Sequence, residues 1–234
     1  MDIQQLVAQF QRDGYLVLDN FFDKQLMQDC NEAILDHFGM SPEFLHNDEF
    51  LSQADTEVIP WFPEREGVAL FSEVNRHALL SELTKAILGD DWYSQYSMVM
   101  FSKQGTKGQA WHQDCPPENP EQFNLNRLVY TMDISEHTGG LTQVMPGSHK
   151  AGLLPSNGQP MSEDDMVTLT PKAGTLVLLH GHCWHKVTPV TGKYRVSTNY
   201  RSAPQGTPED ITDICVYRNM RYRFSTSETI EVRG

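Results

Sequence analysis

From residue 92 onward, short runs rich in β-branched, aromatic and Met residues alternate with Gly, Pro, Asn and Asp. Turn residues recur after about ten residues, which is the rhythm of an antiparallel sandwich or barrel. We therefore expect the larger part of the chain to form a β core. The predicted strands cover residues 92–103, 109–113, 126–134, 141–145, 165–169, 175–179, 185–187, 194–201 and 214–224.

The sequence before residue 92 predicts mostly helices. Apolar residues recur at helical spacing behind Asp2, a good N-cap, and Gly14 ends that run. A short apolar run over residues 15–18 is typical of a strand. A second helix is predicted to begin after Asp23 and to end at Gly39.

Residues 40–75 lack helical periodicity and contain Pro42, Pro60 and Pro63, so we expect a long loop or lid there. A third helix is predicted over residues 77–88. No internal repeat, low-complexity segment or linker rich in Gly or Ser separates domains. The helices are therefore expected to pack on the outside of one β core.

The charge of the chain excludes whole classes of partner. Its 234 residues include 18 Lys and Arg against 31 Asp and Glu, a formal net charge of −13. This charge repels phosphate backbones and anionic lipid, so we expect no nucleic acid and no membrane as partners. The sequence has no long apolar run and no signal-peptide pattern at its start, and its four cysteines show no CxxC spacing. A cytoplasmic protein with free thiols is therefore expected.

Three pieces of sequence carry a chemical signal, and their order matters. In the run Trp111-His112-Gln113-Asp114, an extended chain places His112 and Asp114 on one face. His185 lies at the start of a later predicted strand, and Arg195 follows it with Ser197 on the same strand face. Two imidazoles and a carboxylate form the facial triad of non-haem Fe(II) oxygenases, which leaves positions open for a co-substrate and O2. Arg195 could then bind the far carboxylate of a dicarboxylate co-substrate, with Ser197 as a hydroxyl donor.

The sequence resembles the phytanoyl-CoA dioxygenase family of Fe(II)- and 2-oxoglutarate-dependent oxygenases. The resemblance extends to about residue 202. It includes the opening Phe10-Gln11-Arg12-Asp13-Gly14-Tyr15-Leu16-Val17-Leu18, the motif at residues 111–114, and His180-Gly181 with His185 and Arg195. The most specific stretch is Gly139-Gly140-Leu141-Thr142-Gln143-Val144-Met145-Pro146-Gly147-Ser148-His149-Lys150.

The resemblance implies His112, Asp114 and His185 as Fe(II) ligands and Arg195 as the clamp on 2-oxoglutarate, with Tyr130 near this co-substrate. It implies oxidation of a substrate C–H bond with O2, coupled to decarboxylation of 2-oxoglutarate to succinate and CO2. The carboxylate of Asp114 favours hydroxylation or a related oxidation, because similar halogenases carry a small residue there. We expect a small-molecule substrate, and not an acyl-CoA, since no basic patch for its phosphates is evident.

The family fold is a double-stranded β-helix, a jelly roll of the cupin type with flanking helices. We accordingly expect one domain over residues 1–234. It would comprise a mostly helical N-terminal part with a lid (1–90), a jelly-roll core (91–202) and an undetermined tail packed on the core (203–234).

Two other functions stay open at this point. One is a non-catalytic jelly roll that binds a metal or a small ligand, and the other is a zinc-dependent isomerase or hydrolase of the cupin type. His180, His182 and His185 have a spacing that could also bind zinc. Lys103, Gln109 and His182 are candidates for contact with the substrate.

Overall fold

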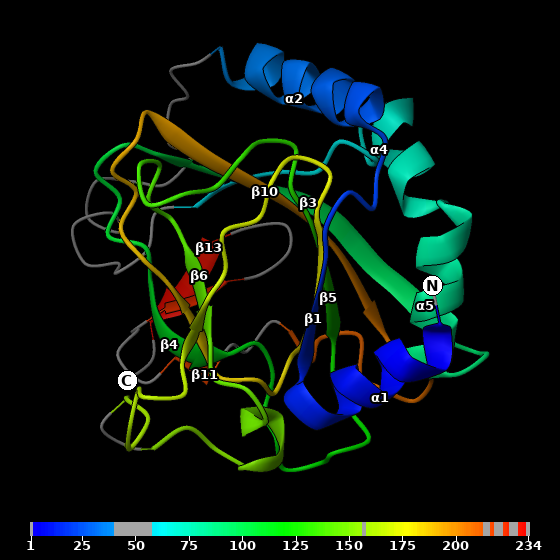
Figure 1. Cartoon of the computed structure of the whole chain (residues 1–234), viewed down its shortest axis with the longest axis vertical. Helices are drawn as coiled ribbons and strands as arrows, with labels where there is room; N and C mark the ends of the chain where they lie inside the picture. The colour runs from blue at the N-terminus through cyan, green and yellow to red at the C-terminus, as the bar shows by residue number, and fades with distance from the viewer. Residues whose placement is uncertain are drawn as a thin grey trace.

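The computed structural model describes residues 2–39, 58–155 and 158–212, and the backbone of three short strands beyond them. Most strands belong to two antiparallel sheets, which face one another as a jelly roll (Figure 1). The strands are β1 (Tyr15–Leu18), β2 (Ile59–Trp61), β3 (Tyr93–Lys103), β4 (Gln109–Gln113), β5 (Leu125–Val129), β6 (Thr142–Val144), β7 (Val167–Thr168), β8 (Leu176–His180), β9 (His185–Val187), β10 (Tyr194–Ala203), β11 (Val216–Tyr217), β12 (Tyr222–Phe224) and β13 (Thr229–Val232).

The larger sheet has the strand order β1-β8-β5-β10-β3-β2, and the smaller has the order β11-β4-β9-β6-β7. Neighbours in both sheets are antiparallel. Strands close in space are far apart in sequence, as β5 and β10 show, so side chains from distant positions meet between the sheets. The predicted fold class, mainly β with flanking helices, is confirmed.

Two helices begin and end where their capping residues predict. In α1 (Ile3–Asp13) the Asp2 carboxylate accepts hydrogen bonds from two backbone N–H groups, and Gly14 ends the helix with a φ of 81°. Asp23 and Gly39 act in the same way on α2 (Lys24–Phe38). The other helices among the described residues are α4 (Ala69–Asn75), α5 (Ala78–Leu88) and the short 3-10 helix η1 (Ser148–Lys150).

The expectation of a loop or lid over residues 40–75 is wrong for its second half. Residues 59–61 form the edge strand β2, and residues 69–75 form α4. Pro60 does not prevent this, because an edge strand leaves one side of its backbone unpaired. Trp61 and Phe71 are buried against each other in the core, with ring centroids 5.4 Å apart. Residues 40–57 lie outside the described part of the chain, so a lid there stays a prediction.

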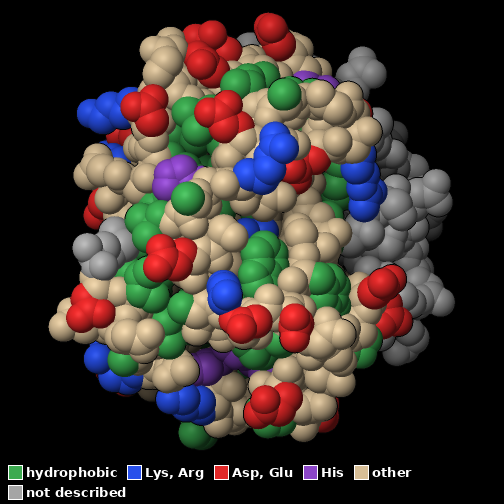
Figure 2. Space-filling model, turned by 90° about the vertical axis from the view of Figure 1, so that its right-hand side faces the viewer, with side chains coloured by type: hydrophobic (Ala, Val, Ile, Leu, Met, Phe, Trp, Pro, Cys, Tyr) green, Lys and Arg blue, Asp and Glu red, His purple; other side chains and the backbone are tan. Residues whose placement is uncertain are grey.

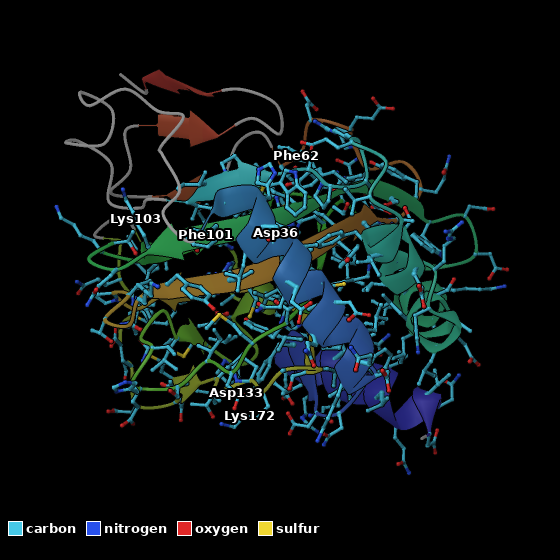
Figure 3. The ribbon with its side chains drawn as sticks, turned by 90° about the horizontal axis from the view of Figure 1, so that it is seen from above. Asp36, Phe62, Phe101, Lys103, Asp133 and Lys172 are labelled. Carbon is cyan, nitrogen blue, oxygen red and sulfur yellow. The ribbon has the colours of Figure 1, made fainter. Side chains whose placement is uncertain are left out.

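Both faces of the larger sheet are buried, which explains its nearly continuous apolar strands. On β8, Leu176 and Leu178 pack with helical residues such as Met27, whereas Val177 and Leu179 face the space between the sheets. Figure 3 shows α2 lying across β3 and β10 on the outer side. The inner face is thereby left for the side chains that form a site.

Two further points concern the ends of elements. The strand predicted over residues 126–134 ends at Val129. Beyond residue 212 only strand backbone is described, and there β11 pairs with β4, with Tyr217 opposite His112.

Among the helices that the structure describes, none combines the length and the apolar character needed to cross a bilayer.

Candidate metal centre

Two histidines face each other across neighbouring strands of the smaller sheet. His112 on β4 is the register partner of His185 on β9, and their ring centroids are 4.0 Å apart. Nδ1 of His112 lies 2.8 Å from the Ala110 carbonyl, and Nδ1 of His185 lies 2.9 Å from the Cys183 carbonyl. Because a carbonyl can only accept, each Nδ1 carries the hydrogen, and each Nε2 keeps a lone pair for a metal ion.

Asp114 completes a triad just beyond the end of β4. Its backbone N–H donates to the Gly181 carbonyl at 2.8 Å. One carboxylate oxygen lies 3.8 Å from Nε2 of His112, and the other lies 3.8 Å from Nε2 of His185. All three side chains are buried, and their ligand atoms lie within 4.8 Å of one another. Within the described ranges, no other group of three His, Cys, Asp or Glu residues converges in this way.

The protonation states of His112 and Asp114 suit a cation. Burial, reinforced by His185, lowers the pKa of His112 to about 3, so its imidazole is neutral at pH 7. Burial alone would raise the pKa of Asp114, but the Arg201 guanidinium and the hydrogen bond from Asn126 hold it below its usual range. No proton therefore has to leave these two groups at neutral pH before a metal binds.

A buried arginine lies on the inner face of β10. Nε of Arg195 donates to the Gly140 carbonyl at 3.1 Å, and Nη1 donates to Oγ of Ser197 at 2.8 Å. The Thr142 hydroxyl lies 3.5 Å from Nη2 and 3.4 Å from the Tyr130 hydroxyl. Burial lowers the pKa of Arg195, an effect opposed by the Tyr130 side chain. Arg195, Ser197 and Tyr130 thus meet although they come from β10 and the end of β5.

Gly140 leaves the space that Arg195 occupies. Its φ of +62° lies in the left-handed region, and a Cβ atom there would be 2.7 Å from Cγ of Arg195. The sequence Gly139-Gly140 thereby serves the placement of an arginine far along the chain.

The substrate candidates lie in different places. Gln109 lines the same pocket as Arg195, together with Ser102 and Val187. Lys103 lies at the end of β3, opposite Tyr194 (Figure 3). Nε2 of His182 lies 3.1 Å from the Gln122 carbonyl, which ties the 116–122 loop to the β8–β9 turn. Contact of Lys103, Gln109 or His182 with a substrate stays a prediction.

The zinc site considered for His180, His182 and His185 is not formed. His185 points to the triad, whereas His180 stacks on Phe123 with ring centroids 3.9 Å apart. The ring of His182 lies 4.9 Å from that of His180 and is held by the Gln122 carbonyl instead. The spacing alone misleads, because His180 and His182 belong to the tight turn over residues 180–183, whereas His185 begins β9.

Acid is expected to destabilise the fold through the cluster of half-buried His149 and buried His180 and His182. Burial lowers the pKa of all three below the ordinary value of 6.5. Between that value and the lowered ones, the unfolded chain binds more protons than the folded chain does. The free energy of unfolding is thus fully retained above pH 6.5 and falls below it, by up to about 1.4 kcal/mol per pH unit for each histidine.

Urea unfolding at pH 7, 6 and 5 measures this loss. The variant His180→Gln lacks one of the three imidazoles, so its free energy of unfolding should fall less steeply with acid. A slope equal to that of the unaltered protein would show that His180 titrates alike in both states.

Arg201 and Asn126 contact Asp114, and Asn199 donates to Asn126. The sequence reasoning missed all three. Nη2 of Arg201 lies 3.5 Å from Oδ1 of Asp114, and the Asn126 amide donates to Oδ2. A signal was present, because residues 195, 197, 199 and 201 alternate along one predicted strand and all are polar. Such alternation on a strand buried on both faces indicates a polar inner site.

Comparison with known proteins adds a family and several relatives. A model of the phytanoyl-CoA dioxygenase (PhyH) family matches residues 10–197. An ectoine dioxygenase of Stutzerimonas stutzeri is 29% identical over 166 residues, which are 65% of this chain and 54% of that protein. The dioxygenase andF of Emericella variicolor is 24% identical over 193 residues, which are 74% of this chain and 63% of that protein. The matched part of this chain thus spans less than two thirds of the length of each of these two relatives.

Solved structures share the fold. The non-haem α-ketoglutarate-dependent epimerase SnoN from nogalamycin biosynthesis matches with a TM-score of 0.68 and 18% identity, over 92% of this chain and 85% of that one. HygX from Streptomyces hygroscopicus, with nickel and 2-oxoglutarate bound, matches with a TM-score of 0.69 and 14% identity. That match covers 89% of each chain. The architecture is therefore that of known jelly-roll enzymes.

Proposed function

The chain belongs to the phytanoyl-CoA dioxygenase family, and on that premise we propose that it is an Fe(II)- and 2-oxoglutarate-dependent dioxygenase. Its reaction would oxidise a C–H bond of a small molecule. The observation that carries this proposal is the convergence of His112, Asp114 and His185, with the buried Arg195 on the facing sheet. The donor set of two imidazoles and one carboxylate fits a ferrous ion with open positions.

In this proposal His112 and His185 bind the iron through Nε2, and Asp114 binds it through its carboxylate. With 2-oxoglutarate and O2, bound iron supplies the oxidising chemistry, which converts the co-substrate to succinate and CO2. The protein holds the three ligands in place beforehand, since the Nδ1 hydrogen bonds fix both rings. Burial of the triad also keeps bulk water from the reacting groups.

Arg195 would bind the distal carboxylate of 2-oxoglutarate, assisted by Ser197 and Tyr130. A guanidinium fits a carboxylate with two parallel hydrogen bonds, and such bonds are strongest where water is excluded. Arg195 is only 5% exposed and is oriented by Gly140, Ser197 and Thr142. It therefore needs little reorganisation when a dicarboxylate binds.

Hydroxylation, or a related oxidation, is the reaction type that we propose. The reason is that Asp114 keeps a carboxylate in the triad, where similar halogenases need a vacant position for chloride.

The substrate class is a small organic molecule. Relatives are named for ectoine, and a similar structure, SnoN, was determined with nogalamycin RO. The net charge of −13 and the interspersed acidic and basic side chains in Figure 2 offer no broad basic surface on that face for a polyanion. Cys30 and Cys183 are buried free thiols, which suits the cytoplasmic location expected from the sequence.

Turnover of 2-oxoglutarate tests the proposed function. Purified protein with Fe(II), 2-oxoglutarate and O2 should release succinate, slowly alone and faster with a suitable member of a metabolite panel. Zn(II) in place of Fe(II) should give none. Activity with Zn(II) that does not depend on 2-oxoglutarate would instead favour the isomerase or hydrolase alternative.

The variant Gly140→Ala is expected to raise the KM for 2-oxoglutarate about 10–100-fold, because the new methyl group displaces Arg195 from its position. Gly152→Ala is the matched control. Gly152 also has a positive φ, of +77°, but a Cβ there meets nothing within 4 Å. Steady-state kinetics on both variants separates the displacement of Arg195 from backbone strain, and equal KM values would refute the role given to Gly140.

A further inference from the structure

Asp114 is held differently from the two histidines. His112 and His185 lie on paired strands of the smaller sheet, so the backbone ladder fixes their separation. Asp114 lies one residue beyond β4, where its backbone is tied to the Gly181 carbonyl. The direction of its carboxylate therefore depends on side chains, and these come from the opposite sheet.

Asn126 on β5 is the centre of that support. Its Nδ2 donates to Oδ2 of Asp114. Its Oδ1 accepts from Nδ2 of Asn124 at 3.1 Å, from Nδ2 of Asn199 at 2.8 Å and from Nε of Arg201 at 2.9 Å. Three donors on one oxygen fix the orientation of the amide, because a flipped amide would place N–H groups against them. The N–H end of Asn126 is thereby directed at the carboxylate.

Arg201 on β10 contacts both members of this pair. While its Nε binds Asn126, its Nη2 lies 3.5 Å from Oδ1 of Asp114. The same guanidinium lies 5.4 Å from the centre of the Tyr96 ring. Arg201 is 7% exposed, Asn126 is 2% exposed and Asp114 is 4% exposed. Hydrogen bonds and ion pairs at this burial are stronger than on a surface.

We propose that Asn126 and Arg201 are positioning residues, which hold the Asp114 carboxylate in the direction required for metal binding. One oxygen is engaged by each, so the carboxylate cannot rotate away from the two imidazoles without breaking buried hydrogen bonds. The larger sheet thereby controls a ligand that belongs to the smaller one. The inference rests on the proposed function for the identity of the metal.

Metal titration of the apoprotein tests this inference, with Co(II) as the probe because its absorption reports coordination geometry. Asn126→Leu removes the donor to Asp114 and keeps the same branched arrangement of heavy atoms in the side chain. Its Co(II) affinity should fall about 10–100-fold, the usual effect of losing a partner of a metal ligand. Asn199→Leu is the matched control, since Asn199 donates to the same Asn126 oxygen. Among the described residues, no hydrogen bond joins Asn199 to Asp114. The Co(II) affinity of Asn199→Leu should therefore change less than about threefold.

Thermal unfolding of the apoproteins separates positioning from a general structural role, since a structural role would lower the melting temperature of both variants and shift Co(II) affinity equally. Equal affinities in the two variants, or an Asn126→Leu affinity equal to the unaltered one, would overturn the inference. Should Asn126→Leu fail to fold, Arg201→Gln provides the same test, with Arg201→Lys expected to restore part of the affinity. Absence of Co(II) binding by the unaltered protein would instead remove the proposed metal centre.

Discussion

The variant His185→Ala is expected to lose 2-oxoglutarate turnover altogether and to bind Fe(II) or Co(II) at least about 100-fold more weakly. The loss should exceed that of a variant next to a ligand, because an entire ligand atom is removed. Only His112 and Asp114 would then remain of the triad. Metal titration and succinate release measure the two effects.

The matched control is His137→Ala, the same substitution at an exposed histidine. It should leave metal affinity and turnover unchanged. If His185→Ala bound metal as tightly as His137→Ala does, the ion would have to lie elsewhere.

The variant Arg195→Gln is expected to raise the KM for 2-oxoglutarate about 100–1,000-fold while leaving Fe(II) affinity unchanged. Truncating one partner of a buried charge pair commonly costs about 2–5 kcal/mol, and 1.4 kcal/mol corresponds to tenfold. Arg195→Lys keeps the charge but not the planar pair of donors, so its KM should lie between that of the unaltered protein and that of Arg195→Gln.

A second substrate makes this test specific to the distal carboxylate. The unaltered protein should prefer 2-oxoglutarate strongly over a 2-oxo acid that lacks this group, such as pyruvate. Arg195→Gln should lose most of that preference. If the variant discriminated between the two acids as before, Arg195 would not be the group that recognises the dicarboxylate.

Local sequence signals sufficed for the elements that frame the site. Asp2 and Asp23 begin their helices, and Gly14 and Gly39 end them, because caps act within one turn of the chain. The strands at residues 109–113 and 185–187 have the predicted bounds. The convergence of His112 with His185 is a register of two strands, which sequence alone does not specify. The ordered motif together with the family resemblance indicated it.

The support around Asp114 could not be predicted with the same ease. Asn126 and Arg201 are far apart in sequence and meet only because β5 and β10 are neighbours in the larger sheet. The half of the expected lid that contains Trp61 is part of the core. Burial of large aromatic side chains stabilises it there, and Pro60, which cannot donate a backbone hydrogen bond, is tolerated at the sheet edge. Both cases depend on tertiary contacts that no local pattern contains.

The most direct measurement is the visible absorption of the purified protein with Fe(II) and 2-oxoglutarate in the absence of O2. The proposed site predicts a weak metal-to-ligand charge-transfer band that needs both components and is lost in His185→Ala. Iron that binds without producing this band when 2-oxoglutarate is added would contradict the account. It would favour a jelly roll that binds metal without oxygenase chemistry.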